Sequence, residues 1–169
     1  MPRQIEAEMQ DLEVAKKRLN EKGLTLSIVK KGEIVFETGS PRISGFLEAV
    51  EKFAERLEGA SVADRVVGKA IALLCVYAEV KAVYGITLSK KAKAVFEKYA
   101  TYHELDNLVE NIRDIYKGKM CPFEKLATEI SNPAEAYERL KNLQRSLSKT
   151  KTNSILHSLS FTFNSDRVV

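Results

Sequence analysis

The chain has 169 residues, of which 44% are hydrophobic and 30% are charged, so it can bury a core without disulfide or metal cross-links. No apolar run approaches the roughly 20 residues of a membrane-spanning helix, and the first residues lack a signal-peptide pattern, so we expect a cytoplasmic protein with no membrane partner. The net charge of +4 lies entirely in the segment from Lys141 onward, which argues against a nucleic-acid-binding face on the body of the fold.

The first third of the chain predicts a helix, a β-hairpin and a second helix. Apolar residues recur at helical spacing over residues 4–21, and Gly23 ends that helix. Residues 24–29 and 34–36 alternate in character on either side of Lys31-Gly32, which predicts two antiparallel strands joined by a tight turn. An amphipathic stripe over residues 43–57 predicts the second helix.

The segment from Ser61 to Glu79 predicts one buried helix. Ser61 is a candidate N-cap, and Asp64 stands three residues later, where a capping box places an acid. Residues 70–77 are apolar on all sides, as in a helix buried among other elements. The free N–H groups at such a helix start attract anions, so Ser61 and Asp64 are candidate ligand-binding residues. Alternatively, Asp64 only complements the helix dipole.

The rest of the chain alternates strands with helices. β-Branched residues predict an interior strand over residues 80–88, followed by a helix over 89–99, a short strand at 101–104 and a helix over 106–116. Pro122 and Pro133 suit the first turns of two more helices, and the Ser/Thr/Asn-rich residues 148–169 predict a polar, flexible tail. We therefore predict one α/β domain over residues 1–147, a three-layer α/β/α fold with a mixed sheet and extra terminal helices.

Three stretches carry a resemblance to a known family: Leu24-Thr25-Leu26 with residues 31–37, residues 59–70, and Met120-Cys121-Pro122-Phe123-Glu124-Lys125. They resemble the uncharacterised family catalogued as domain of unknown function 1893, over about residues 11–130. That resemblance implies a cytidine deaminase-like fold, to which the order of predicted elements is also similar. It supplies no established activity.

The zinc ligands of a cytidine deaminase are missing at the positions compared. Such an enzyme needs a His or Cys, with a Glu two positions on, at the start of the buried helix, and a Pro-Cys-x-x-Cys run at a later helix. Val62 and Asp64 occupy the first motif here, and Ala92 and Val95 replace the two cysteines of the second. We therefore expect a deaminase-like fold that is not a zinc-dependent deaminase, with no metal site and no predicted cofactor.

Gly68 and Lys69 do not form a phosphate loop. That motif requires a glycine where Ala63 stands and Ser or Thr where Ala70 stands. A glycine inside a helix costs stability, so Gly68 serves either close packing or clearance for a ligand. Gly68, Lys69 and Lys125 are therefore further candidate ligand-binding residues.

The two cysteines have different predicted roles. Cys75 lies in an apolar run and reads as a small core residue. Cys121 precedes Pro122 at a helix start, where the positive end of the helix favours a thiolate. Cys121 is therefore either a nucleophile, with Glu124 as its acid–base partner, or a structural cap. An alternative zinc pair, Cys121 with Glu124, still lacks a third ligand because Val62 cannot bind metal.

These observations lead to three hypotheses. The first is a domain that binds an unidentified small molecule, anionic or nucleotide-like, in a deaminase-like pocket without metal. The second is a cysteine-dependent enzyme that uses Cys121. The third is a protein–protein interaction module whose terminal helices present faces to a partner, including a second copy of this chain.

Overall fold

A five-stranded sheet forms the centre of the structure, a computed structural model that describes residues 2–41, 43–113 and 118–163, with only the backbone for residues 2, 4 and 157–163. The elements follow one another in this order: α1 (Pro2–Glu21), β1 (Leu26–Lys30), β2 (Glu33–Thr38), α2 (Ser44–Leu57), β3 (Ser61–Val67), α3 (Lys69–Tyr77), β4 (Ala82–Ser89), α4 (Lys90–Lys98), β5 (Tyr102–Val109), α5 (Pro122–Ala127) and α6 (Pro133–Phe163).

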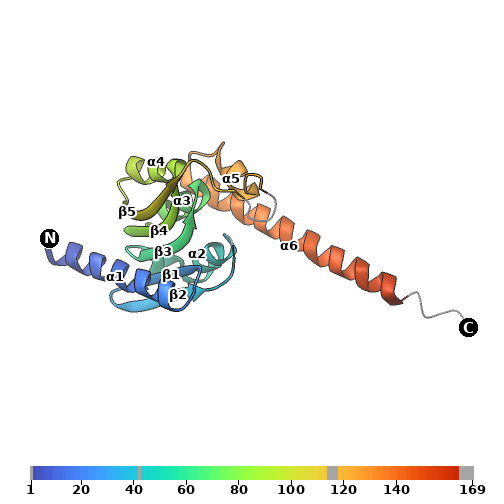
Figure 1. Ribbon diagram of the computed structural model, residues 1–169, viewed down its shortest axis with the longest axis horizontal. Helices are drawn as coiled ribbons and strands as arrows, with labels where there is room; N and C mark the ends of the chain where they lie inside the picture. Colours follow the sequence, from blue (N-terminus) through green and yellow to red (C-terminus); the bar gives the residue numbers. More distant parts are fainter. Residues whose placement is uncertain (1, 42, 114–117, 164–169) are drawn as a thin grey trace, which may run out of the picture.

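The sheet is mixed and has the strand order β2-β1-β3-β4-β5. Strand β1 runs antiparallel to both β2 and β3, whereas β3, β4 and β5 are parallel to one another. Parallel neighbours need crossover connections, which α3 and α4 supply. Helices cover both faces of the sheet (Figure 1). The predicted α/β class with three layers is therefore confirmed.

Each face of the sheet has its own apolar core. On one face α1 buries Leu12, Ala15 and Leu19 against side chains of β1, β3 and β4. The larger core lies on the other face, where α2, α3, α4, α5 and the start of α6 pack together. The side chains of α1 at helical spacing thus cover the sheet, as its sequence pattern predicts.

The predicted hairpin is present, and α1 fixes its turn. Lys31 and Gly32 both have positive φ angles, 52° and 77°, as a two-residue turn with the twist of a hairpin requires. The carboxylate of Asp11 accepts hydrogen bonds from the backbone N–H groups of both turn residues, each at 2.7 Å. Asp11 is 7% exposed, so α1 holds the turn through hydrogen bonds to a buried carboxylate.

The predicted helix from Ser61 to Glu79 is wrong in its first half. Ser61–Val67 is strand β3, and α3 begins only at Lys69, after Gly68. Asp64 pairs with Leu26 on one side and with Gly85 on the other, so hydrogen bonds from two neighbouring strands override the local capping signal. The comparison of Val62 and Asp64 with a motif at a helix start therefore has no structural basis.

The second half of the chain differs from its prediction at β5. The strand over 80–88 and the helix over 89–99 are confirmed as β4 and α4, with Ser89 as the N-cap that accepts a hydrogen bond from the Ala92 N–H. β5 extends to Val109, so the predicted helix over 106–116 is wrong where the structure describes it, and its last three residues lie outside the described part. Every residue of the edge strand β5 is half-buried or exposed. Its sequence therefore lacks the alternation of apolar and polar residues that marks a half-buried strand.

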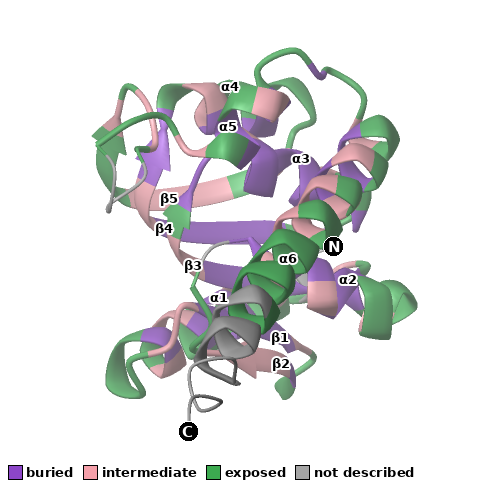
Figure 2. Cartoon of the chain, turned by 90° about the vertical axis from the view of Figure 1, so that its right-hand side faces the viewer, coloured by how far each residue is buried: buried purple, intermediate pink, exposed green. Residues whose placement is uncertain are grey.

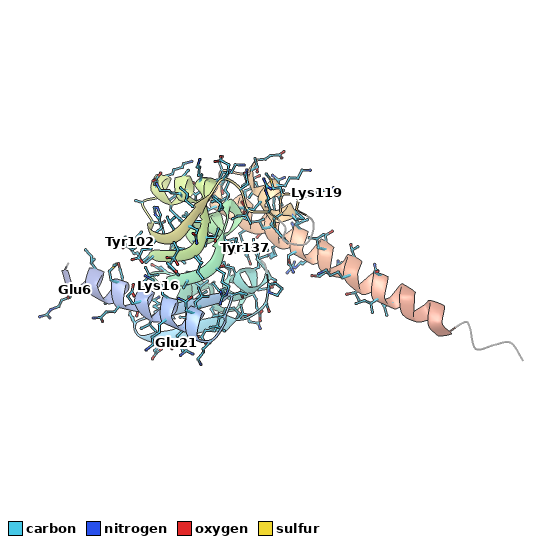
Figure 3. The ribbon with its side chains drawn as sticks, viewed as in Figure 1. Glu6, Lys16, Glu21, Tyr102, Lys119 and Tyr137 are labelled. Atoms are coloured by element: carbon cyan, nitrogen blue, oxygen red, sulfur yellow. The ribbon has the colours of Figure 1, made fainter. Side chains whose placement is uncertain are left out.

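Helix α6 continues far beyond the predicted end at residue 147. Ala136, Tyr137 and Leu140 near its start are buried against the body, and Figure 3 shows Tyr137 where α6 meets the other elements. From residue 148 onward the described side chains are exposed, and the helix projects from the body (Figures 1 and 2). Here Thr150 and Thr152 donate hydroxyl hydrogen bonds to the carbonyls of Ser146 and Ser148, so these hydroxyls are satisfied within the helix itself.

The two halves of α6 predict opposite responses to the same substitution. Leu140→Ala, at a fully buried position, should lower the free energy of unfolding by about 2–5 kcal/mol because it leaves a cavity. Leu156→Ala, at a position 59% exposed, should change it by less than about 0.5 kcal/mol. Urea unfolding of both variants measures the difference. A comparable loss for Leu156→Ala would mean that the distal half also packs on the body.

Candidate functional site

A basic hollow of about 320 Å³ lies between α3 and α4 and is closed by the connection from α5 to α6. These elements meet at one end of the molecule (Figure 1). Three lysines line it, Lys69 at the start of α3 and Lys91 and Lys98 on α4. The remaining lining residues are apolar or carry hydroxyls: Leu73, Ala94, Val95, Tyr99, Thr128 and Ser131.

The ammonium groups around the hollow lack carboxylate partners. Within the described ranges, no carboxylate forms an ion pair with Lys69, Lys91 or Lys98, whereas two other lysines of α4, outside the hollow, pair with Glu97 and Glu110. Burial lowers the pKa of Lys69, and the positive charges of Lys91 and Lys98 lower it further, against an opposing effect of Glu124. The hollow therefore gathers three lysines that form no ion pair with any carboxylate in the described part of the chain.

Glu124 anchors the start of α3, the helix that forms one side of this hollow. Its carboxylate accepts hydrogen bonds from the backbone N–H groups of Lys69 at 2.9 Å and Ala70 at 2.8 Å, the first free donors of α3. Glu124 is 8% exposed, and burial raises the pKa of its carboxyl despite these two hydrogen bonds. The Glu124 carboxylate, a group of the same chain, thus occupies the anion position at the start of α3.

Gly68 serves close packing rather than ligand clearance. A Cβ atom at Gly68 would lie 2.3 Å from the carboxyl carbon of Glu124, far inside van der Waals contact. Its φ of −94° is open to any residue. The glycine is therefore required by the approach of the Glu124 carboxylate and not by backbone conformation.

Ser61 and Asp64, both predicted to bind a ligand, lie on β3 and do not line the hollow. Ser61 is fully buried and donates its hydroxyl hydrogen bond to the Glu8 carbonyl of α1 at 3.1 Å. Asp64 accepts a hydrogen bond from the Val66 N–H at 3.0 Å, and burial raises the pKa of its carboxyl to about 7. The structure thus gives Ser61 a packing role and leaves Asp64 as a poorly solvated carboxyl inside the sheet.

Cys121 and Lys125 also lie outside the residues that line the hollow. Cys121 is half-buried at the N-cap of α5, a helix of six residues, and Lys125 is exposed. The hydrogen bonds of the Glu124 carboxylate go to α3 and not to Cys121. Cys121 thus occupies the N-cap position without a capping hydrogen bond from its side chain, and catalysis by Cys121 with Glu124 stays a prediction.

Of the predicted ligand-binding residues, Lys69 alone lines the hollow. Lys91, Lys98 and Tyr99 also line it and are not among the residues predicted to bind a ligand. A signal was present, because Lys91, Ala94, Val95 and Lys98 stand at spacings of three, four and seven on one helix face. Their meeting with Lys69 depends on tertiary packing.

The part of the chain that the structure describes contains no group of three or more His, Cys, Asp or Glu side chains placed to hold a metal ion. Nor does any described helix combine the length and apolar character needed to cross a bilayer.

The sequence profile of one family, a domain of unknown function (DUF1893), matches residues 14–144. This chain belongs to the DUF1893 family. The crystal structure of a DUF1893 family protein from Thermotoga maritima is similar, with 27% sequence identity and a TM-score of 0.73. The similarity covers 79% of this chain and 89% of that chain. It supports the family membership without supplying an activity.

The resemblance to deaminases is weaker. Two crystal forms of Acinetobacter baumannii RibD match with 19% identity and TM-scores of 0.39 and 0.41. They cover 73% and 75% of this chain, and 36% and 37% of the RibD chain. Such scores carry no argument about the site. No curated protein matches the chain.

The contact between Gly68 and Glu124 predicts a strong energetic coupling. Gly68→Ala should cost about 1–3 kcal/mol of unfolding free energy through overpacking, and Glu124→Ala a similar amount through unsatisfied N–H groups on α3. In the double variant the added methyl meets no carboxylate, so Gly68→Ala should then cost close to nothing. Urea unfolding of the four proteins measures this cycle.

The matched control is Gly39→Ala, because a Cβ there meets nothing within 4 Å. If the double variant loses as much unfolding free energy as the two single variants together, the contact with Glu124 is not the reason for glycine at position 68.

The half-buried, poorly solvated carboxyl of Asp64 predicts a pH-dependent loss of stability. Because its pKa is raised from 3.8 to about 7, the folded state binds more protons than the unfolded state, so stability falls as the pH rises between about 4 and about 7. Asp64→Asn keeps an acceptor for the Val66 N–H and removes the charge. This variant should unfold at a higher temperature than the parent at pH 8, and the difference should vanish near pH 4. The exposed Glu129→Gln is the control, and an equal response in both would exclude burial as the cause.

Proposed function

We propose that this protein binds a small anionic molecule in the hollow between α3 and α4. The observation that carries the proposal is the convergence of three lysines from two helices on one concavity, without an ion pair to a described carboxylate. Like charges that are held together destabilise a fold unless an anion compensates them. Binding of an anion restores that balance.

The size and lining of the hollow favour a small ligand over a polymer backbone. A volume of about 320 Å³ lies at the lower end of the range of small-molecule pockets. Leu73, Ala94 and Val95 supply an apolar wall, while Tyr99, Thr128 and Ser131 add polar groups. A phosphorylated or carboxylated metabolite with a small apolar part matches this lining.

This site differs from the one that the sequence predicts. It keeps Lys69 and the anionic character of the ligand, and Lys91 and Lys98 take the place of Ser61, Asp64, Gly68 and Lys125. The cysteine-dependent enzyme and the interaction module stay predictions. The exposed distal half of α6 is the observation that favours the interaction module.

Isothermal titration with inorganic pyrophosphate at low salt tests the proposal. Lys69→Gln and Lys91→Gln should each weaken binding by about ten-fold, since a hydrogen bond to a charged group contributes about 1.5 kcal/mol and 1.4 kcal/mol corresponds to a factor of ten. Affinity should also fall as the salt concentration rises, because salt screens the attraction.

The matched control is Lys125→Gln, which removes the same charge from an exposed position outside the hollow and should leave the affinity unchanged. Equal weakening by all three substitutions would show that only the net charge of the protein matters and would overturn the proposed site.

A further inference from the structure

Lys69 is held in place in the hollow by a contact of its side chain. Lys69 and Lys91 are both half-buried, whereas Lys98 is exposed. The Lys69 ammonium donates a hydrogen bond to the Thr128 carbonyl at 3.2 Å, which holds it against the connection between α5 and α6. Leu73 lies one turn further along α3 and lines the same hollow. Lys69 thus combines a fixed amine, an apolar neighbour and nearby positive charge.

A lysine becomes a nucleophile at neutral pH when desolvation or a neighbouring cation favours its uncharged form. Lys69 is half-buried in the hollow that Lys91 and Lys98 also line, and its burial and their positive charges both lower its pKa. Glu124 is the one nearby acid that opposes them, and its oxygens are engaged by the backbone of α3.

We propose that Lys69 captures the carbonyl group of a small anionic aldehyde or ketone as an imine, while Lys91 and Lys98 bind its anionic group. This inference rests on the proposed function, because the anionic group brings the carbonyl carbon to the amine. It names the ligand class of the hollow as anionic carbonyl compounds, such as phosphorylated aldehydes or keto acids.

The covalent step needs no oxidant or cofactor. The lone pair of the uncharged Lys69 Nζ attacks the carbonyl carbon, a C–N bond forms as the C=O π bond breaks, and one proton passes from Nζ to the carbonyl oxygen. The C–O bond of this carbinolamine then breaks, the hydroxyl leaves as water with the second Nζ proton, and a C=N bond forms between Nζ and the former carbonyl carbon. Addition of water reverses the reaction, so the capture is reversible.

Reductive trapping with pyridoxal 5′-phosphate, an aldehyde that carries a phosphate, tests this inference on the full chain. Sodium borohydride reduces the imine to a stable secondary amine, and peptide mass spectrometry locates it. At limiting reagent we expect modification at Lys69 before any other lysine. Pyridoxal without the phosphate should modify Lys69 about ten-fold less, the loss of one contact of about 1.4 kcal/mol.

Two variants separate the imine from simple anion binding. Lys69→Arg keeps the positive charge but removes the primary amine, so it should lose the modification while weakening pyrophosphate binding less than Lys69→Gln does. Lys91→Gln should reduce the rate of modification at Lys69, whereas Lys52→Gln on α2, which removes an exposed lysine paired with Glu48, should not.

Modification of Lys69 no faster than that of Lys52, or equal labelling with and without the phosphate, would overturn the imine proposal. If pyrophosphate binding persists in that case, the anion site stands and the covalent step alone fails. If pyrophosphate binding is also absent, both proposals fail.

Discussion

The hydrogen bonds from the start of α3 to the Glu124 carboxylate hold α3 and α5 together at the candidate site. They join residues 54 and 55 positions apart in sequence, and they satisfy backbone donors that would otherwise be buried without partners. The same contact positions Lys69, requires glycine at position 68, and ties α5 to the helix layer. Because a buried carboxylate already occupies the helix terminus, the charge available to a ligand comes from lysine side chains.

The sequence predicts the fold well where local pattern and tertiary packing agree. The hairpin has a turn pair that adopts positive φ angles, and α1 and α2 have clear amphipathic stripes, so these elements are found as expected. β3 is misread because Ser61 and Asp64 imitate a helix start, while Arg65 inside the strand is satisfied by the Leu24 carbonyl at 2.5 Å. Charged residues are seldom buried without a partner, so the sequence alone does not indicate that Arg65 belongs to a central strand.

The candidate site is predictable only in part for the same reason. Lys69 stands out beside Gly68, but Lys91 and Lys98 belong to a helix that is separated from it by β4. Their shared face follows from helical spacing, whereas its orientation toward α3 follows from the crossover between parallel strands. The role of Glu124 depends on α5 folding back onto α3, a contact that no local pattern encodes.

Helix α6 packs on the body near its start and then projects from it as a long arm. Leu147 packs against the core, the side chains of residues 148–156 are exposed, and at 1.5 Å per residue the helix from Leu147 to Phe163 reaches about 24 Å. A fluorescent label at the distal end would therefore report the tumbling of the whole body with little local contact. The same distance keeps a tag or surface attachment at this end away from the hollow.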